Sequence, residues 1–297
     1  VVHGGPGFAA PVVIDDTVQA ALEALVPLAP LHQPHCLAGI RAARAAFPGA
    51  TQIACFDTAF HRTMPRVNEI YAIPHEFYDQ GIRRYGFHGL SYDYIASALR
   101  EADPALAAGR VVVAHLGNGA SLCAMKDGKS VMTSMGFSAL DGLVMGTRCG
   151  KIDPGVLLYL LDQGMDSKAL SDMLYRQSGL LGLSGISNDM RTLLASDDPR
   201  AVEAVACFVA SLQRGIAEMA AAMGGIDGIV FTAGIGENAA AIRAQVCDGL
   251  GWMGVTLDAG ANEGGGETIS PPGSSVQVKV IPTREDLVIL RAVRQVA

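Results

Sequence analysis

The chain has 297 residues, enough for one large domain or two ordinary ones, and half of them are hydrophobic. Charged residues make up 17% and the net charge is −7, which argues against a nucleic-acid-binding protein, because such proteins present a basic surface. No continuous run of about 18 apolar residues and no signal peptide is visible, so we expect no membrane span and no membrane partner.

The six cysteines form no Cys-x-x-Cys pair, and several lie in apolar runs. This pattern is typical of reduced core thiols in a cytoplasmic protein. All seven histidines lie at or before His115, so any histidine chemistry must come from this first part of the chain.

The first predicted element is the end of a strand, at "VVHGG". A helix is then predicted over "IDDTVQAALEAL", with Asp15 or Asp16 as its N-cap. A second helix, "CLAGIRAARAAF", ends at a Pro-Gly pair, and a short strand, "TQIACF", ends abruptly at Asp57. The position of this carboxylate, directly after a strand that is predicted to be buried, requires an explanation. A third helix is predicted from Ser91, as its cap, to Glu101.

An antiparallel meander of three strands is predicted over "RVVVAHLGNGASLCAMKDGKSVMTS", where Asn118-Gly119 and Asp127-Gly128 suit tight turns with positive φ. Residues 154–224 are predicted to be mostly helical. A strand, "DGIVFTAG", is followed directly by a helix, "ENAAAIRAQV". A last strand, "SSVQVKVIP", is followed by the last helix, "REDLVILRAVRQV". Residues 260–275 are predicted to be an exposed loop. The order of elements indicates a mixed α/β fold.

Two glycine-rich turns could hold phosphate. The first, "HLGNGAS", exposes backbone N–H groups, although taken alone this turn is better explained as an ordinary hairpin. The second, "TAGIGENAA", adds a helix N-terminus. The second turn also approaches the dinucleotide fingerprint, with Gly234, Gly236 and Ala239 in place and Asp258 further on. A nicotinamide oxidoreductase is therefore the rival function, although few residues follow Ala239 to complete such a domain.

Several isolated polar residues have both a functional and a structural interpretation. Arg148 between glycines is either an approachable cation or a surface charge, and His88 in "YGFHG" is either catalytic or structural. Asp189 and Arg191 lie at a predicted helix start, and Glu285 lies in the first turn of the last helix, where acids are favoured anyway. Together, the turns, arginines and carboxylates form the set that phosphoryl transfer needs. No His/Cys metal cluster and no Ser-His-Asp pattern competes with it.

The order of motifs resembles that of the acetate kinase family over nearly the whole chain. The motifs are "VVHGG", "APLHQP", "FDTAFHRTMP", "RRYGFHG", "HLGNGAS", "TSMGF", "GLVMGTRCGKIDP", "SGISNDMR", "TAGIGEN" and "VIPTRED". The resemblance implies an actin-like (ribonuclease H-like) two-domain α/β kinase fold with the active site in the interdomain cleft. Residues 1–59 with 285–297 would belong to the acyl-substrate domain, and 60–284 would form the nucleotide-binding domain.

The implied activity is reversible transfer of the ATP γ-phosphoryl group to acetate, giving acetyl phosphate and ADP. Mg²⁺ or Mn²⁺ is the implied cofactor, and the implied assembly is a homodimer. A protein that binds ATP without turnover is a third possibility. The family opens with a strand, a further phosphate loop and an arginine directly before "VVHGG", and none of these stands in this sequence. We therefore expect the 297 residues alone to be a poor kinase, while 60–284 still bind ATP.

The resemblance also assigns residues. Asp57 matches the catalytic acid, His88 and Arg148 match the pair that stabilises the transition state, and Glu285 matches the magnesium-linked glutamate. The residues that match nucleotide-binding positions are His115, Leu116, Gly117, Asn118, Gly119, Asp189, Met190, Arg191, Gly234, Ile235, Gly236, Glu237 and Asn238. The residues that match the pocket for the acetate methyl group are Val2, Leu31, Phe87 and Ala139.

Two residues depart from the family pattern within these motifs. Ala139 stands where the family usually has proline, and Arg284 stands where asparagine is usual. Acetate is already ionised at pH 7, because carboxylic acids titrate near pH 4, so it needs no general base. We therefore interpret Asp57 as a residue that holds Mg²⁺ or its waters, with Thr58 fixing its orientation.

Overall fold

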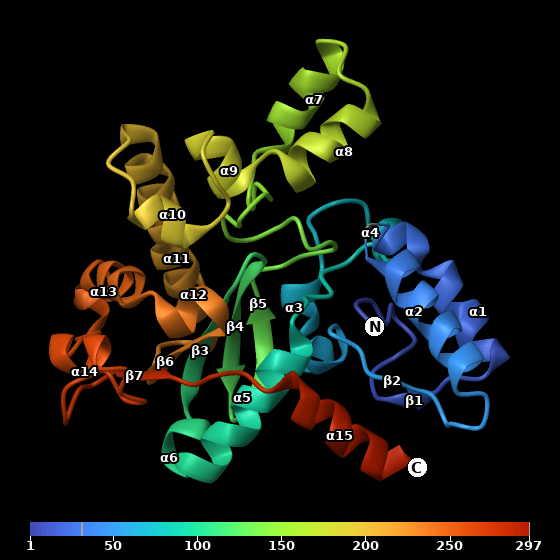
Figure 1. The fold of residues 1–297 in the computed structure, drawn as a ribbon, viewed down its shortest axis with the longest axis horizontal. Coiled ribbons are helices and arrows are strands. Elements are labelled where there is room, and N and C mark those ends of the chain that lie inside the picture. The colour runs from blue at the N-terminus through green and yellow to red at the C-terminus, as the bar shows by residue number, and fades with distance from the viewer. Residues whose placement is uncertain (31, 297) are drawn as a thin grey trace.

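The computed structural model describes residues 1–30 and 32–296. Leu31, one of the predicted pocket residues, lies outside this part of the chain. The predicted mixed α/β fold is confirmed: a five-stranded sheet with the order β5-β4-β3-β6-β7 forms the centre of the molecule, and helices surround it (Figure 1). A separate two-stranded sheet lies in the N-terminal segment.

The predicted meander is confirmed in the central sheet. Its strands are β3 (Arg110–Leu116), β4 (Ala120–Lys126), β5 (Lys129–Thr133), β6 (Gly228–Thr232) and β7 (Gln277–Val280). The first three pair antiparallel, whereas β6 pairs parallel to β3, and β7 pairs parallel to β6. One turn prediction is wrong. Asp127 and Gly128 have positive φ, but Asn118 and Gly119 do not, because the first turn is a wider one, closed by the Gly117 N–H donating to the Gly119 carbonyl at 3.0 Å.

Both faces of the sheet are buried, because successive side chains of a strand point to opposite sides. Val112 packs on the side covered by α11 (Pro199–Met223), and Val113 packs on the side covered by α5 (Gly89–Ala102). By length and hydropathy α11 could cross a membrane, yet half of that apolar window is buried inside the protein. Its apolar face is therefore accounted for by packing on the sheet.

The N-terminal segment has its own small core. The strands β1 (Val12–Val13) and β2 (Ile53–Ala54) pair antiparallel, and the helices α1 (Asp16–Ala24) and α2 (Gln33–Ala46) pack beside them. The buried core residues are Ile14, Leu22, Leu37, Ile40, Ala54 and Phe56. The predicted Asp15 cap is confirmed, since its carboxylate accepts from the Val18 N–H at 2.7 Å.

"VVHGG" is not a strand as predicted. The Val1 backbone makes two hydrogen bonds to the neighbouring segment, donating to the Cys55 carbonyl at 2.8 Å and accepting from the Asp57 N–H at 3.2 Å. The chain then turns at once, because Gly5 adopts φ +57° and the Phe8 N–H donates back to the Gly4 carbonyl at 3.1 Å. The two glycines thus end the extended pairing before a strand can form.

The other helices follow the predicted order. They are the 3₁₀ turns Val26–Leu28, Ala59–Thr63 and Gly251–Met253, and α3 (Arg66–Glu69), α4 (His75–Asp79), α6 (Pro104–Ala107), α7 (Pro154–Asp162), α8 (Ser167–Arg176), α9 (Gly179–Ser184), α10 (Met190–Leu194), α12 (Ala233–Asn238), α13 (Ala240–Asp248), α14 (Ala259–Glu263) and α15 (Glu285–Val296). In Figure 1, α7 and α8 project from the body, and α15 lies beside α5.

Two further predictions about elements need correction. Helix α5 begins at Gly89 and not at Ser91, because His88 adopts a left-handed conformation with φ 58° that sets the start, and the Ser91 hydroxyl bonds to Thr283 instead of capping. Residues 260–275 are not simply an exposed loop. Part of α14 lies there, and Ile269 is fully buried, with its N–H donating to the Val278 carbonyl at 2.8 Å.

Candidate active site

A cavity of about 790 Å³ unites three of the motifs singled out in the sequence. Because β3 and β6 run parallel, the turns that follow them meet at the same edge of the sheet. Helix α10 closes the opposite side. The lining residues are Gly117, Asn118, Asn188, Asp189, Met190, Arg191, Leu194, Gly234, Ile235, Asn238 and Ala239. Sequence reasoning did not assign Asn188, Leu194 or Ala239 to the nucleotide site, although Asn188 and Ala239 lie within quoted motifs and Leu194 lies one helical turn after Met190.

The polar groups of this cavity are paired locally. Asp189 caps α10 by accepting from the Arg191 N–H at 2.9 Å, and its carboxylate also pairs with the Arg191 guanidinium. That ion pair and hydrogen bond lower the pKa of Asp189 to about 2. The Asn188 side chain donates to Asn118 Oδ1 at 3.0 Å, which joins the α10 segment to the first glycine-rich turn. The polar groups of the cavity thus satisfy one another, and the Arg191 side chain is exposed.

Five predicted nucleotide residues do not line this cavity: His115, Leu116, Gly119, Gly236 and Glu237. The Glu237 carboxylate instead accepts from the Ala233 N–H at 2.8 Å and the Thr283 N–H at 3.3 Å. It thereby supports the positive φ of 64° at Ala233, an unusual conformation for a residue other than glycine.

Asp258, which the dinucleotide hypothesis needs at a ribose, does not line the cavity. It caps α14 by accepting from the Ala261 N–H at 2.9 Å. Only β3, β6 and β7 are parallel in a sheet that is otherwise antiparallel. Neither feature matches a dinucleotide-binding domain.

His88 and Arg148 converge on the first glycine-rich turn, next to the cavity. A methyl group placed on Gly119 would lie 3.4 Å from His88 Nε2 and 3.6 Å from Arg148 Nη1. Arg148 Nη1 donates to the Ala139 carbonyl at 3.1 Å and to the Met145 sulfur at 3.7 Å, which leaves the Nε and Nη2 donors available. Burial lowers the pKa of Arg148 below its usual value, but a guanidinium stays charged. A small anion above Gly119 would meet both side chains.

The imidazole rings of His88 and His115 stack at 4.1 Å. Each Nδ1 contacts a serine hydroxyl, Ser121 at 2.8 Å and Ser91 at 2.9 Å, respectively. Burial, followed by the charges of His115 and Arg148, lowers the pKa of His88 well below its usual value, and burial lowers that of His115 to about 4. Both rings are therefore neutral at pH 7. Sequence reasoning did not identify either serine as part of the site.

The strand before Asp57 is shorter than predicted, since β2 ends at Ala54 and Asp57 follows three residues later, and Glu285 begins α15. Burial, together with the nearby carboxylate of Glu285, raises the pKa of Asp57 to about 7, and burial raises the pKa of Glu285. Two carboxylates from opposite ends of the chain thus approach each other in a poorly solvated place. Thr58 does not orient Asp57 as expected, since its hydroxyl accepts from the Gly4 N–H at 3.0 Å and so fixes the N-terminal turn.

Among the described residues, no group of three or more histidine, cysteine, aspartate or glutamate side chains is arranged to hold a metal ion. The pair of Asp57 and Glu285 could therefore supply only part of a coordination shell. This arrangement suits Mg²⁺, which usually takes one or two protein carboxylates and completes its shell with phosphate oxygens and water.

Phe87 and Ala139 are buried in the large hydrophobic core of the central sheet, and Val2 is half-buried against the same core. The fourth predicted pocket residue, Leu31, is not described. Its neighbour His32 was missed, although the motif "APLHQP" contains it. Burial and the charge of Arg148 lower the pKa of His32, so this imidazole lies within the electrostatic reach of the guanidinium.

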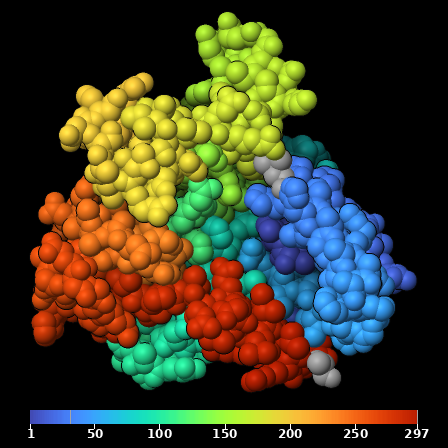
Figure 2. Space-filling model, in the orientation of Figure 1, coloured from blue at the N-terminus to red at the C-terminus, as the bar shows by residue number. Residues whose placement is uncertain are grey.

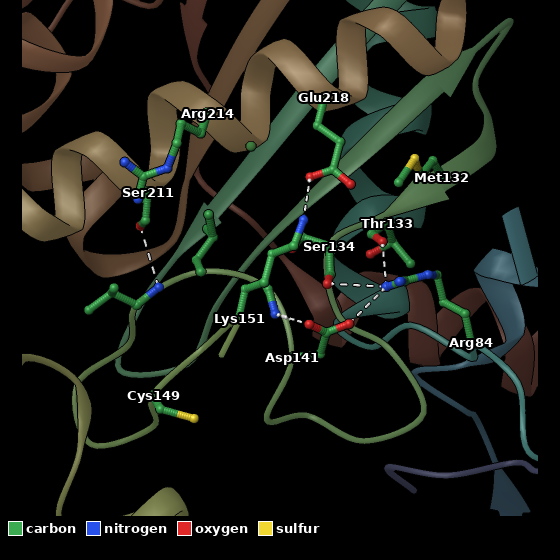
Figure 3. A pocket seen from close by; sticks show the side chains of 14 residues that line it. Arg84, Met132, Thr133, Ser134, Asp141, Cys149, Lys151, Ser211, Arg214 and Glu218 are labelled. Atoms are coloured by element: carbon green, nitrogen blue, oxygen red, sulfur yellow. Dashed lines mark hydrogen bonds and ion pairs between the residues drawn. The ribbon is translucent and has the colours of Figure 1, made fainter. Parts of the chain in front are cut away.

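A second cavity of about 440 Å³ lies behind the loop that carries Arg148 (Figure 3). Arg84 donates there to the carbonyl oxygens of Thr133, Ser134 and Met135 and pairs with Asp141 at 3.2 Å. Across the cavity, Lys151 and Glu218 lie 3.6 Å apart. These interactions anchor the start and the end of the Arg148 loop to β5 and α11.

The fold and the site together define the class of this protein as an ATP-dependent kinase. The chain belongs to the acetokinase family, which matches residues 1–291. An acetate kinase from Methylocella silvestris is 56% identical over 98% of this chain and 72% of its own length. One from Rhodopseudomonas palustris strain TIE-1 is also 56% identical, over 100% of this chain and 76% of its own length.

Two solved structures share the fold over the full length of this chain. The acetate kinase of Porphyromonas gingivalis is 39% identical with a TM-score of 0.93, and 76% of it is covered. A propionate kinase from Francisella tularensis is 40% identical with a TM-score of 0.95, and 78% of it is covered. The expected actin-like α/β kinase fold is thereby confirmed.

Proposed function

We propose that this protein is an acetate kinase, which transfers the γ-phosphoryl group of ATP reversibly to acetate and forms acetyl phosphate and ADP. The observation that supports this best is the convergence of His88 and Arg148 on Gly119. Gly119 directly follows Gly117 and Asn118, which line the cavity of the nucleotide motifs, and Arg148 donates to the carbonyl of Ala139, a predicted residue of the methyl pocket. A phosphoryl group there would have adenosine on one side and a methyl group on the other.

We propose that the large cavity holds the nucleotide. Its volume of about 790 Å³ is within the usual range for small-molecule sites. Gly117 and Asn118 would contact the phosphates, while the turn at Gly234 and the Asp189–Arg191 pair would face the adenosine. His115, Gly236 and Glu237 would support these turns from behind, as their contacts indicate.

We propose that Asp57 and Glu285 hold Mg²⁺ or Mn²⁺ together with phosphate oxygens. The bound ion would reduce the repulsion between the anionic acetate and the γ-phosphate. Arg148 would act in the same direction, because its planar fork can contact two oxygens at once. Asp57 has no proton to remove from acetate, which is ionised at pH 7. Asp57 would instead position the metal ion, so that the ion compensates the negative charge that develops during phosphoryl transfer.

We propose two domains, residues 1–59 with 285–297 on the acyl side and 60–284 on the nucleotide side. The separate core of the N-terminal segment supports this division. In Figure 2, the blue N-terminal residues and the orange and yellow residues flank a central hollow floored by green ones. Asp57 and Glu285 come from the first domain, and His88 and Arg148 from the second, so the reacting groups would meet between them.

We propose that the helix α7 forms a homodimer interface. None of its residues is buried, although it is highly apolar, and it projects from the body (Figure 1). Val156, Leu158, Tyr159 and Leu161 are all exposed. A continuous exposed apolar surface of this kind marks an interaction site. Light scattering on Leu158→Glu, compared with the unaltered chain, tests this: a monomer is expected for the variant, and an unchanged mass would contradict the assignment.

The activity is tested by incubating the protein with ATP, Mg²⁺ and acetate and trapping the acyl phosphate with hydroxylamine. Formation of the hydroxamate, about 10²–10³-fold slower for Arg148→Ala, is the expected result. Calorimetry with ATP–Mg²⁺ and with NAD separates the rival functions. NAD binding without ATP binding would contradict the kinase assignment. ATP binding with no acyl phosphate would instead favour a nucleotide-binding protein without turnover.

A further inference from the structure

His88 is held by two buried side chains that come from different elements. Ser121, on β4, contacts His88 Nδ1 through its hydroxyl at 2.8 Å, and the same hydroxyl is hydrogen-bonded to the Tyr92 hydroxyl. Tyr92 lies on α5, one helical turn after His88. Both Ser121 and Tyr92 are 0% exposed, so water cannot replace either partner.

The direction of these hydrogen bonds follows from counting protons. The Tyr92 hydroxyl has one proton, and Ser121 is its only hydrogen-bond partner among the described residues. If Ser121 donated to Tyr92, the Tyr92 proton would be buried without an acceptor, which is strongly unfavourable. Tyr92 therefore donates to Ser121, and the Ser121 proton is directed to His88 Nδ1.

A neutral imidazole that accepts at Nδ1 carries its proton on Nε2. In His88, Nε2 is the atom that faces Gly119 and the Arg148 guanidinium. We propose that Tyr92 and Ser121 are positioning residues that fix His88 as the Nε2–H tautomer, so that an uncharged donor faces the transferring phosphoryl group. The opposite tautomer would present a lone pair to the phosphoryl oxygens and would oppose their binding.

The identity of the ligand, a transferring phosphoryl group, rests on the proposed function, whereas the tautomer of His88 does not. His115 provides an internal comparison. Its Nδ1 contacts Ser91, but the Ser91 hydroxyl has a second hydroxyl partner, Thr283, at 2.9 Å. Because the Ser91 hydroxyl donates its one proton to the Thr283 hydroxyl, it has no proton for His115 Nδ1, so the chain of donors that fixes His88 is not repeated at His115. The Tyr92–Ser121 pair acts on His88 alone.

The test uses nitrogen-15 NMR of the histidine side chains in the full chain, with the His88 signals assigned from His88→Gln. In the unaltered protein, we expect His88 Nδ1 to be unprotonated and Nε2 to be protonated. Tyr92→Phe keeps the ring and removes the donor, so the tautomer should become mixed or reverse, while the His115 signals stay in place. Tyr78→Phe is the matched control, because its hydroxyl bonds to Glu69, outside this chain of contacts.

Steady-state kinetics then link the tautomer to catalysis. For Ser121→Ala we expect kcat to fall about tenfold or more, with the KM for ATP changed less than about twofold, because the lost donor acts in the transition state. Ser121→Thr keeps the hydroxyl and should restore most of kcat and the original tautomer. Thermal melts verify that each variant folds.

The outcomes separate the two proposals. An unaltered chain with His88 protonated at Nδ1, or a tautomer unchanged in both Tyr92→Phe and Ser121→Ala, would overturn the inference. The expected tautomer in a protein that forms no acyl phosphate would support the positioning by Tyr92 and Ser121 and count against the proposed kinase activity. A shifted tautomer with full kcat would refute the catalytic part of the inference.

Discussion

The nucleotide cavity lies next to a proposed reacting centre around Gly119, which is formed by Asp57, His88, Arg148 and Glu285. The two regions are built in different ways. The cavity is assembled from turns within residues 117–239, and its charged pair, Asp189 and Arg191, is exposed and self-neutralising. The centre draws on the two ends of the chain as well as its middle, and Asp57, His88, Arg148 and Glu285 are half-buried. Burial raises the pKa of Asp57 to about 7 and lowers that of His88 well below its usual value.

The difference reflects what each region has to do. A binding cavity needs shape and satisfied polar groups, which local turns provide at little energetic cost. A reacting centre needs donors and charges that are not neutralised by water, so that they act on the charge that develops in the transition state. We therefore expect substitutions in the cavity to change KM and those in the centre to change kcat.

Arg148→Ala should have the largest effect. Removing one preorganised cation from the centre should lower kcat by about 10²–10³-fold, while the KM for ATP changes little. Arg191→Ala is the matched control in the cavity. Its side chain is 91% exposed, so the KM for ATP should rise at most about fivefold and kcat should stay the same. Equal losses of kcat in both variants would contradict the proposal that the cavity determines KM and the centre determines kcat.

Asp57→Asn should lower kcat to a similar degree and weaken the dependence of activity on Mg²⁺, if the carboxylate holds the ion. Activity of the variant that keeps its Mg²⁺ dependence and recovers at high pH would instead support a general base.

The pH dependence of the free energy of unfolding gives an independent measurement of the Asp57 carboxyl group. The pKa of Asp57 rises from 3.8 to about 7 on folding, so the folded chain binds more protons than the unfolded chain between these values. The free energy of unfolding contributed by Asp57 should therefore fall as the pH rises from about 4 to about 7. Asp57→Asn should flatten that slope in denaturant titrations, and added Mg²⁺ should stabilise the unaltered chain most above pH 7. Asp189→Asn, whose pKa is lowered to about 2, should leave the slope between pH 4 and 7 intact.

Gly119→Ala probes the point where the two regions meet. Its added methyl group would only reach ordinary contact distance from His88 and Arg148, and Gly119 does not have positive φ, so the variant should fold. The methyl group would nevertheless occupy the space assigned to the phosphoryl group. We expect kcat to fall about 10²-fold, the scale of a displacement of about 1 Å, with an unchanged melting temperature. A variant with full activity would show that transfer takes place elsewhere.

The sequence predicted the cavity better than the centre, and the reason is physical. The meander and the turn at Gly234 follow from local patterns, and parallel pairing of β3 with β6 then brings the turns together. The pair of Asp57 and Glu285 depends on tertiary packing of α15, which no local pattern encodes, and only the family resemblance suggested it. The contact of Ser121 and Tyr92 with His88 also depends on tertiary packing, because a buried hydroxyl group leaves no periodic pattern in the sequence. "VVHGG" failed as a strand because Gly5 turns the chain.

Ala139→Pro should have the smallest effect and tests the acyl side of the centre. Ala139 is buried, and its carbonyl accepts from Arg148, so a change in its size alters the proposed methyl pocket without adding a charge. We expect the unaltered protein to prefer acetate and still use propionate, because one methylene is worth only about 1–3 kcal/mol of discrimination. The proline ring should narrow the pocket and raise the ratio of kcat/KM for acetate over propionate by about tenfold. Val2→Ala, which widens the same pocket, should lower that ratio. A kcat/KM for propionate above that for acetate in the unaltered chain would contradict the assignment of the pocket.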